Sequence, residues 1–381
     1  MKKVIKQDNS NIRKDSYDLL TKENDEAPNN PEGLKLLTEE IEITKATYDE
    51  NLSIVSDILN DIKIEKKIDI EKIQIVAKSL VNNVLKHTDA MLILSRVRKF
   101  DDYTFKHSVN VAILTIALGK YLNYPDKEVE ILGTGGLLHD CGKMKVPNEI
   151  LNKEGRFSEA EFEIMKKHPI YGAEILEESA QFDQKSILMA LQHHEKYSGG
   201  GYPTGCTGSK ISTFGMMTAV ADVYDAITSD RVYNKALNPF EGLKKLYTEK
   251  GHQFHPTIFE HFVYSIGLFP LGSLVQLKNG LIGIIVSVNR NNLMYPRVLV
   301  IANETGKMFF MPYIVNVNPP RSEESGKWTM ESIFEDNKET KGFAPDEKQG
   351  YKVDKVIEPS EYNIDVDFQF NNMQKLIQQI S

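Results

Sequence analysis

The chain has 381 residues, a length that favours more than one folded unit with at least one sizeable core. Hydrophobic residues make up 41% and charged residues 26% of it, ordinary globular proportions that exclude a largely disordered or fibrous protein. The formal net charge of −8 argues against a surface that binds DNA or RNA polymers, so a phosphate-containing ligand would need a local site.

The cysteine content and the N-terminus predict where the protein works. Cys141 and Cys206 are too few for a disulfide framework or a cysteine-rich zinc site, and they favour a reducing compartment. Residues 1–18 include basic residues but lack the apolar core of a signal peptide, and no later segment reaches about 18 uninterrupted apolar residues. We therefore expect a cytoplasmic protein without a membrane partner.

The N-terminal part of the chain divides into a polar tail and a helical region. Residues 1–32 are polar and end in a stretch rich in Pro and Asn, a composition typical of a tail or linker. In residues 33–100 apolar residues recur at steps of three and four, as in Ile54, Ile58 and Ile62, which is the period of amphipathic helices. We interpret this region as a regulatory or dimerising helical bundle, which makes a homodimer one candidate assembly.

Residues 101–270 form a second helical region with clear signals for helix starts. The spacing of Ser158 and Glu161 predicts a capping box, and Pro239 and Pro256 stand where the first turn of a helix accepts proline. Strand-like patterning is scarce in this region. The predicted fold class is therefore mainly α.

The pattern changes in residues 271–381, which we interpret as a small β appendage. Four short β-branched runs separated by turn signals predict a small antiparallel sheet. The runs cover residues 273–277, 281–288, 297–301 and 307–311. Residues 319–350 have the composition of a long solvated loop, and they precede a strand-like segment at 353–357 and a final helix expected near 371–380.

Five of the nine histidines lie between residues 107 and 194, where two aspartates accompany them. Asp140 follows His139 at the end of a predicted helix, and a carboxylate can bridge two metal ions. Asp222 lies in a largely apolar helical pattern, where a carboxylate is costly unless it is paired or metal-bound. The full set is His107, His139, Asp140, His168, His193, His194 and Asp222. Each has an ordinary alternative, such as a core or solvated side chain, but one metal site explains all seven.

In this order, the seven residues resemble the HD superfamily of metal-dependent phosphohydrolases. Residues 193–203, His-His-Glu-Lys-Tyr-Ser-Gly-Gly-Gly-Tyr-Pro, further resemble its HD-GYP branch, the bacterial cyclic di-GMP phosphodiesterases. Residues 221–231, Ala-Asp-Val-Tyr-Asp-Ala-Ile-Thr-Ser-Asp-Arg, follow the same family pattern. The resemblance covers about residues 101–270, and the sheet near 273–317 is similar to the family's usual appendage. It implies a helical HD-type catalytic domain between the N-terminal helices and a small antiparallel appendage.

The resemblance implies two divalent metal ions that share one carboxylate. The first would be bound by His107, His139, Asp140 and Asp222, and the second by Asp140, His168, His193 and His194. Such nitrogen and oxygen ligands suit iron or manganese and can also accept zinc or other divalent ions. Some family members bind a third metal through a Glu four residues before the first His. Tyr103 stands at that position, so we expect two ions.

The resemblance also assigns catalytic and substrate-binding roles. Asp140 and Lys143 would be catalytic, with Asp140 bridging the metals that activate water and Lys143 contacting the scissile phosphate. Arg231 matches a family arginine that contacts substrate, and its planar guanidinium suits bidentate binding. A solvent-facing lysine and a surface ion pair are the alternatives for these two cations.

The glycine-rich loop, residues 199–203, contributes no good metal ligand. We expect its Gly201 and Tyr202 on the substrate side, and the family implies a docking site there for a diguanylate cyclase or another signalling protein. The alternative is a mobile loop without a binding role. Glu195 and Asp225 are expected to orient histidines or Lys143.

These residues predict a dinuclear-metal phosphodiesterase that opens cyclic di-GMP to linear pGpG, with further hydrolysis to GMP left open. Ser198 stands where the family commonly has Asp, and Asn234 replaces a commonly basic residue, so the preference among cyclic dinucleotides is open as well. One alternative is hydrolysis of a mixed GMP and AMP ring. The other is a module that senses the dinucleotide or docks a cyclase without hydrolysing anything.

Overall fold

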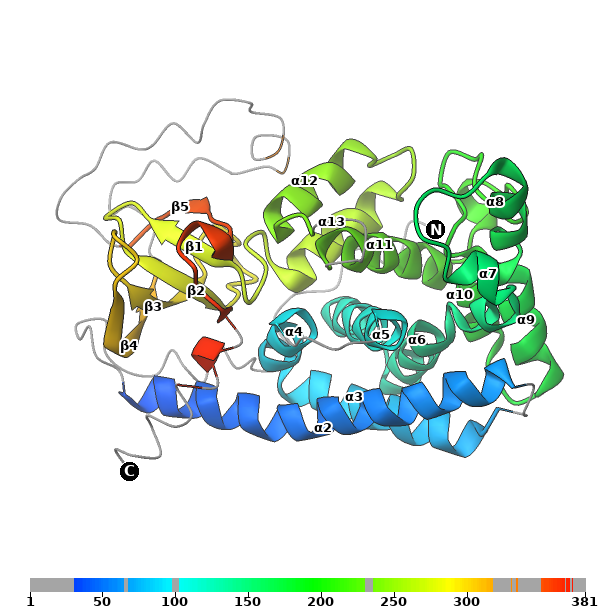
Figure 1. Cartoon of the computed structure of the whole chain (residues 1–381), viewed down its shortest axis with the longest axis horizontal. Helices are drawn as coiled ribbons and strands as arrows, with labels where there is room; N and C mark the ends of the chain where they lie inside the picture. The colour runs from blue at the N-terminus through cyan, green and yellow to red at the C-terminus, as the bar shows by residue number, and fades with distance from the viewer. Residues whose placement is uncertain are drawn as a thin grey trace.

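The computed structural model describes residues 31–64, 68–97, 103–229, 236–317, 330, 334, 351–366, 368–370 and 372. Within these residues, helices make up most of the chain as far as Ile266, and a five-stranded sheet follows (Figure 1). The expected mainly α fold with a small C-terminal antiparallel sheet is confirmed. Arg231, most of the polar tail and the loop at 319–350, and nearly all of the helix expected near 371–380 lie outside the described residues.

Three helices form the described N-terminal region, and their apolar faces are turned inward. They are α2 (Pro31–Lys63), α3 (Ile70–Lys86) and α4 (Thr88–Val97). The periodic residues Ile58 and Ile62 are buried, as an amphipathic helix requires. Asp69 caps α3 by accepting a 3.1 Å hydrogen bond from the backbone N–H of Lys72. Helix α2 runs along much of the molecule and contacts α3, α4 and α5 (Figure 1).

The second helical region carries all seven candidate metal ligands. Its helices are α5 (Tyr103–Tyr121), α6 (Asp126–Leu138), α7 (Asn148–Leu151), α8 (Glu159–Met165), α9 (His168–Glu178), α10 (Gln184–Gln192), α11 (Thr213–Thr228), α12 (Pro239–Thr248) and α13 (Pro256–Ile266), with short 3₁₀ helices η2 (Cys141–Lys145) and η3 (Gly208–Lys210). The capping box of Ser158 and Glu161 is confirmed, and Pro239 and Pro256 begin α12 and α13 as predicted.

The C-terminal sheet is antiparallel, with strand order β4-β3-β2-β1-β5. Its strands are β1 (Leu274–Leu277), β2 (Ile282–Ser287), β3 (Arg297–Ala302), β4 (Met308–Asn316) and β5 (Val353–Val356). The prediction that the fourth strand ends at residue 311 is wrong, because β4 pairs with β3 as far as Asn316, opposite Arg297. Pro312 is tolerated within it because β4 lies at the edge of the sheet, where no neighbouring strand needs its missing N–H.

A buried polar contact connects the N-terminal helices to the sheet. The Asp89 carboxylate in α4 accepts a 2.7 Å hydrogen bond from the hydroxyl of Ser287 in β2 and forms a 3.0 Å ion pair with Arg290. One hydrophobic core extends from Leu34 in α2 to Phe370 near the C-terminus. The regions proposed from the sequence therefore pack around a common interior, and their exact boundaries stay a prediction. Among the described helices, none is both long and apolar enough to cross a bilayer.

Candidate metal centre

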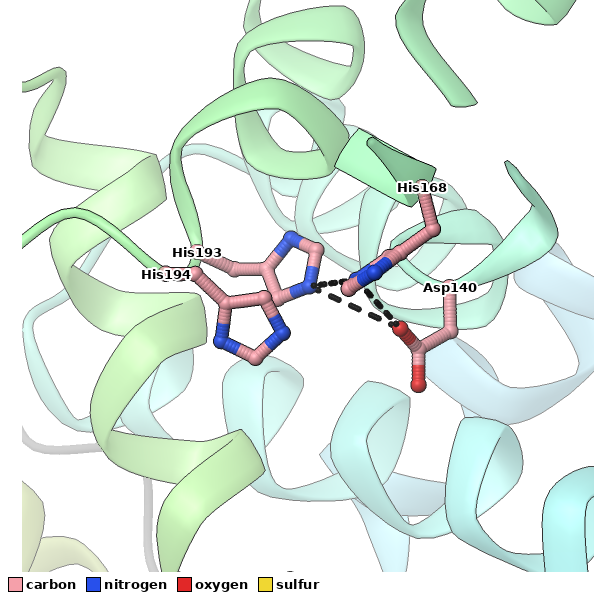
Figure 2. A group of neighbouring side chains, drawn as sticks. All are labelled: Asp140, His168, His193 and His194. Atoms are coloured by element: carbon pink, nitrogen blue, oxygen red, sulfur yellow. Dashed lines mark hydrogen bonds and ion pairs between the residues drawn. The ribbon is translucent and has the colours of Figure 1, made fainter. Parts of the chain in front are cut away.

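The folded chain brings the seven candidate ligands to one place from separate helices. His107 lies in α5, His168 begins α9 and Asp222 lies in α11, while the two adjacent pairs follow the last turns of α6 and α10. These pairs are His139 with Asp140, and His193 with His194. Figure 2 shows His193 and His194 side by side, facing Asp140 and His168.

The ligand atoms form three overlapping groups, and within each group they lie within 4.8 Å of one another. The groups are Asp140 with His168, His193 and His194; His107 with His139 and Asp140; and His139 with His193 and Asp222. Asp140 belongs to two of these groups, so its carboxylate lies where two sets of ligands meet. The seven residues thus lie close together in the folded chain, and their role as ligands stays a prediction.

Three of the histidine rings are oriented by backbone carbonyls. The Nδ1 atoms of His139, His168 and His193 each lie 2.8 Å from a carbonyl oxygen of the preceding turn, those of Gly136, Met165 and Ala190 respectively. A carbonyl can only accept, so Nδ1 carries the hydrogen and the Nε2 of the neutral ring keeps its lone pair. These Nε2 lone pairs face the centre of the site, as metal ligands must.

The inward-facing atoms are poorly matched to one another without a cation. The Nε2 atoms of His168 and His193 are 3.2 Å apart, although in the neutral rings neither has a hydrogen to donate. The Nε2 of His139 and the Oδ1 of Asp140 are buried and have no hydrogen-bond partner among the described residues. Buried polar atoms of this kind are costly unless something binds them. The donor set therefore fits divalent metal ions.

The two carboxylates are ionised despite their burial. Burial alone would raise the pKa of Asp140, but the charge of Lys143 and the interactions with His139 and His168 hold that pKa well below its usual value. Burial opposes ionisation of Asp222 in the same way, and its hydrogen bond and charge interaction with His107 lower its pKa. Both side chains can therefore act as anionic ligands at neutral pH.

Asp225 orients His107, as the sequence predicted. Its Oδ2 lies 2.7 Å from Nδ1 of His107, and the Nε2 of the same ring lies 3.0 Å from Oδ1 of Asp222. Burial lowers the pKa of His107, but hydrogen bonds to the two carboxylates outweigh it and raise the pKa to about 9. This position consequently favours a positive charge, which either a proton or a metal ion can supply.

Glu195 has a different role from the one expected. Its Oε1 accepts hydrogen bonds of 2.7 Å from both the backbone N–H and the hydroxyl of Thr204, and one of 3.1 Å from the N–H of Gly205. The expectation that Glu195 orients a histidine or Lys143 is therefore wrong. The carboxylate instead fixes the end of the glycine-rich loop by these hydrogen bonds, because the chain turns back over Glu195 after Pro203.

The glycine-rich loop lies against the metal centre. The Tyr202 ring centroid is 4.7 Å from that of His194, and the backbone N–H of Tyr202 donates to the His194 carbonyl at 3.2 Å. A Cβ at Gly201 would lie 2.6 Å from the Cα of Glu195, which is too close for any side chain. The loop thus needs glycine at position 201 in order to place the Tyr202 ring beside a candidate ligand.

Asn110 is a site residue that the sequence did not reveal. Its amide Nδ2 donates a 2.8 Å hydrogen bond to Oδ1 of Asp225, on the carboxylate that orients His107. The available signal was weak: a polar residue in an apolar helix, one turn after His107. Its side chain is buried, so its polar atoms depend on protein partners.

Gly142 allows the turn that carries Asp140 to approach α9, and Gly142→Ala is expected to weaken metal binding. An added Cβ would overlap the His168 carbonyl oxygen and the Gly172 N–H, so η2 must move away and separate Asp140 from His168. We expect a loss of about 1–3 kcal/mol in the free energy of unfolding, typical of overpacking, together with weaker metal affinity in titrations.

Gly172→Ala is the matched control for Gly142→Ala. Its added Cβ would have ordinary contacts, the nearest at 3.5 Å from Ala190, and it lies inside α9, where alanine is the better helix former. Wild-type metal affinity in Gly142→Ala would contradict the idea that this close approach positions Asp140.

A mainly helical fold with buried clusters of His and Asp defines an HD-type metal-binding domain. In agreement, a family model described as an HD domain matches residues 85–258. The chain is 37% identical over 281 residues to the cyclic di-GMP phosphodiesterase PA4108 of Pseudomonas aeruginosa, a match that covers 74% of this chain and 68% of that protein. The chain therefore belongs to the HD-GYP family of HD-domain phosphodiesterases.

Two further relatives are similar over shorter stretches. The cyclic di-GMP phosphodiesterase response regulator RpfG of Xanthomonas campestris is 40% identical over 140 residues, which cover 36% of this chain and 37% of that protein. The 3'3'-cGAMP-specific phosphodiesterase 2 of Vibrio cholerae is 35% identical over 158 residues, which cover 41% of this chain and 30% of that protein. The similarity thus extends to relatives named for two different cyclic dinucleotides.

Proposed function

We propose that this chain is a metal-dependent phosphodiesterase that hydrolyses cyclic di-GMP to linear pGpG. The observation that carries the proposal is the position of the Asp140 carboxylate, which belongs to two groups of candidate ligands. A carboxylate so placed can hold two metal ions close together, the arrangement that supports in-line displacement at phosphorus. The names of the relatives PA4108 and RpfG support cyclic di-GMP as the substrate.

The proposed metals are two divalent ions, iron or manganese before zinc. The first would be bound by His107, His139, Asp140 and Asp222, and the second by Asp140, His168, His193 and His194. Support comes from the inward-facing Nε2 lone pairs and from the unpartnered Nε2 of His139 and Oδ1 of Asp140 among the described residues. The group of His139, His193 and Asp222 lies across both sets, in keeping with two neighbouring ions.

The bound metals would lower the pKa of a water molecule and polarise the phosphate oxygens. The water oxygen would bond to phosphorus and lose a proton, the P–O bond to the ribose 3′ oxygen would break, and the leaving oxygen would take up a proton. Lys143 is the cation that can meet the negative charge on the nonbridging oxygens, because its ammonium group contacts Asp140 and its side chain is part-exposed. Tyr202, beside His194, is placed to contact the substrate from the loop side.

The proposal is tested by hydrolysis of cyclic di-GMP with the Mn²⁺-loaded and Fe²⁺-loaded full chain, with products separated by chromatography. We expect pGpG to form only with metal, and linear pGpG offered as substrate tests whether hydrolysis continues to GMP. Binding of cyclic di-GMP without turnover under every metal condition would contradict the enzyme and favour the sensing module instead.

Hydrolysis of a mixed GMP and AMP ring is the second candidate function. It is favoured by the similarity to the Vibrio cholerae enzyme named for 3'3'-cGAMP and by Ser198, which departs from the family's common Asp beside the glycine-rich loop. The same assay with 3'3'-cGAMP decides between the substrates through the ratio of kcat/KM values. A larger kcat/KM for 3'3'-cGAMP would reassign the substrate and leave the metal chemistry unchanged.

Several narrower expectations remain proposals. They are a cytoplasmic location, a homodimer built on the N-terminal helices, docking of a diguanylate cyclase or another signalling protein on the glycine-rich loop, and contacts of Arg231 and Gly201 with substrate. Tyr202 and Gly201 are partly exposed, which supports a loop that a ligand or partner can reach.

A further inference from the structure

A chain of three hydrogen bonds connects helix α2 to the metal centre. The Tyr48 hydroxyl in α2 donates to Oδ1 of Asn110 in α5 at 2.9 Å. The Nδ2 of Asn110 donates to Oδ1 of Asp225 at 2.8 Å, and Oδ2 of Asp225 lies 2.7 Å from Nδ1 of His107. Tyr48 thus reaches a candidate metal ligand through two intermediate side chains, although it lies outside the matched HD domain at 85–258.

The direction of each bond in this chain is fixed by chemistry. The Asp225 carboxylate accepts from Asn110, so the amide turns its N–H₂ group toward Asp225 and its carbonyl oxygen toward Tyr48. The Tyr48 hydroxyl can therefore only donate to Asn110. At the other end, His107 donates from Nδ1, which leaves the Nε2 lone pair directed at the candidate metal position beside Asp140 and Asp222.

Burial makes these bonds more than incidental contacts. The relative exposure is 0% for Tyr48, 2% for Asn110 and 3% for His107, so bulk water does not compete for their polar atoms. Loss of the Tyr48 hydroxyl would leave the Asn110 carbonyl oxygen without this donor in a buried place. A buried network of this kind holds its members in one arrangement only while each partner is present.

We propose that Tyr48 is a positioning residue for the metal ligand His107. It holds the Asn110 amide, which with His107 holds the Asp225 carboxylate, and that carboxylate sets the ring orientation and tautomer of His107. Groups behind the ligands of a metal site commonly set its affinity in this way. The inference rests on the proposed metal site, and it makes the N-terminal helix α2 part of the metal-binding unit of this chain.

The test is Co²⁺ binding by Tyr48→Phe, measured in the full chain by titration and by the visible absorption spectrum of the bound ion. Phe keeps the ring and removes only the hydroxyl, so the fold is expected to survive, as far-ultraviolet circular dichroism will check. We expect Co²⁺ affinity to fall by about tenfold, the lower end of the range for groups behind a ligand, with a changed absorption spectrum.

Ser79→Ala is the matched control, because it also removes one hydroxyl that contacts α2. The Ser79 hydroxyl lies 3.3 Å from the amide of Asn51 in α2, and this contact leads away from the metal centre toward α3. We expect wild-type Co²⁺ affinity and spectrum in Ser79→Ala. An equal loss in both variants would overturn the proposal, because the effect would then be general loosening of α2.

A double-mutant cycle of Tyr48→Phe and Asn110→Ala tests whether Tyr48 acts on His107 through Asn110. If Tyr48 acts through Asn110, the double variant should bind Co²⁺ about as weakly as Asn110→Ala alone. Additive losses, wild-type binding in Tyr48→Phe, or no Co²⁺ binding by the wild-type chain would each overturn the inference. A wild-type chain that binds Co²⁺ in the predicted way but hydrolyses no cyclic dinucleotide would contradict only the proposed function.

Discussion

Asp140→Asn is expected to abolish turnover and to remove most bound metal, the largest effect of any single substitution in this chain. Asn has the same shape but no charge, and its amide offers only one good ligand oxygen, so it cannot bridge two cations. A metal ion at phosphorus supplies several kcal/mol of transition-state stabilisation, so we expect kcat/KM to fall by about 10³-fold or more. Elemental analysis should show fewer than two metals per chain.

The control for Asp140→Asn is Asp126→Asn, which changes an exposed aspartate at the start of α6, the helix that precedes Asp140. It makes the same chemical change away from the ligands and should retain metal and activity. Metal should also raise the Tm of the wild-type chain and of Asp126→Asn much more than that of Asp140→Asn, since a ligand stabilises only the state that binds it. Two metals per chain and full turnover in Asp140→Asn would refute the bridging role.

The chemical identity of the site could be predicted because it depends on residue types in a fixed order. His139 with Asp140 and His193 with His194 are adjacent in the sequence, and each pair follows the end of an apolar helix. Asp222 stands out as a carboxylate among apolar neighbours. Such residues are costly to bury without a partner, so their presence in helical patterns already indicated a shared ligand.

The roles of Glu195 and Tyr48 could not be predicted, because they depend on how distant backbone segments return to the site. Glu195 looked like a partner for a histidine because it follows two of them, yet its oxygen binds the N–H groups of Thr204 and Gly205. Tyr48 and Asn110 are 62 residues apart, and amphipathic spacing predicts only that each faces a core. Which buried polar groups meet there depends on how α2 packs against α5.

The full length of strand β4 also could not be predicted from the sequence. The β-branched runs predicted four strands near their observed positions, but Pro312 concealed the length of β4. A proline is informative only when the place of the strand in the sheet is known, since an edge strand tolerates it and a central strand does not. The order β4-β3-β2-β1-β5, which makes β4 an edge, depends on long-range pairing.

Lys143→Met is expected to lower kcat by about 10²–10³-fold while both metals stay bound, the range found when one donor to a developing oxyanion is removed. Met keeps a similar length and apolar stem but has no charge. In the structure the ammonium of Lys143 contacts Oδ2 of Asp140, a carboxylate that metal ions would neutralise. With metals bound to Asp140, the lysine is expected to turn to the phosphate, which is the remaining anion beside it.

Two further variants distinguish a specific role of the Lys143 ammonium in catalysis from a general effect of positive charge near the site. Lys145→Met removes a lysine from the exposed end of the same 3₁₀ helix and should leave kcat unchanged. Lys143→Arg keeps the positive charge and should restore part of kcat, although the guanidinium differs from the ammonium in shape. Loss of metal in Lys143→Met would mean that the lysine supports the ligands instead of the phosphate, and a raised KM with unchanged kcat would limit its role to substrate binding.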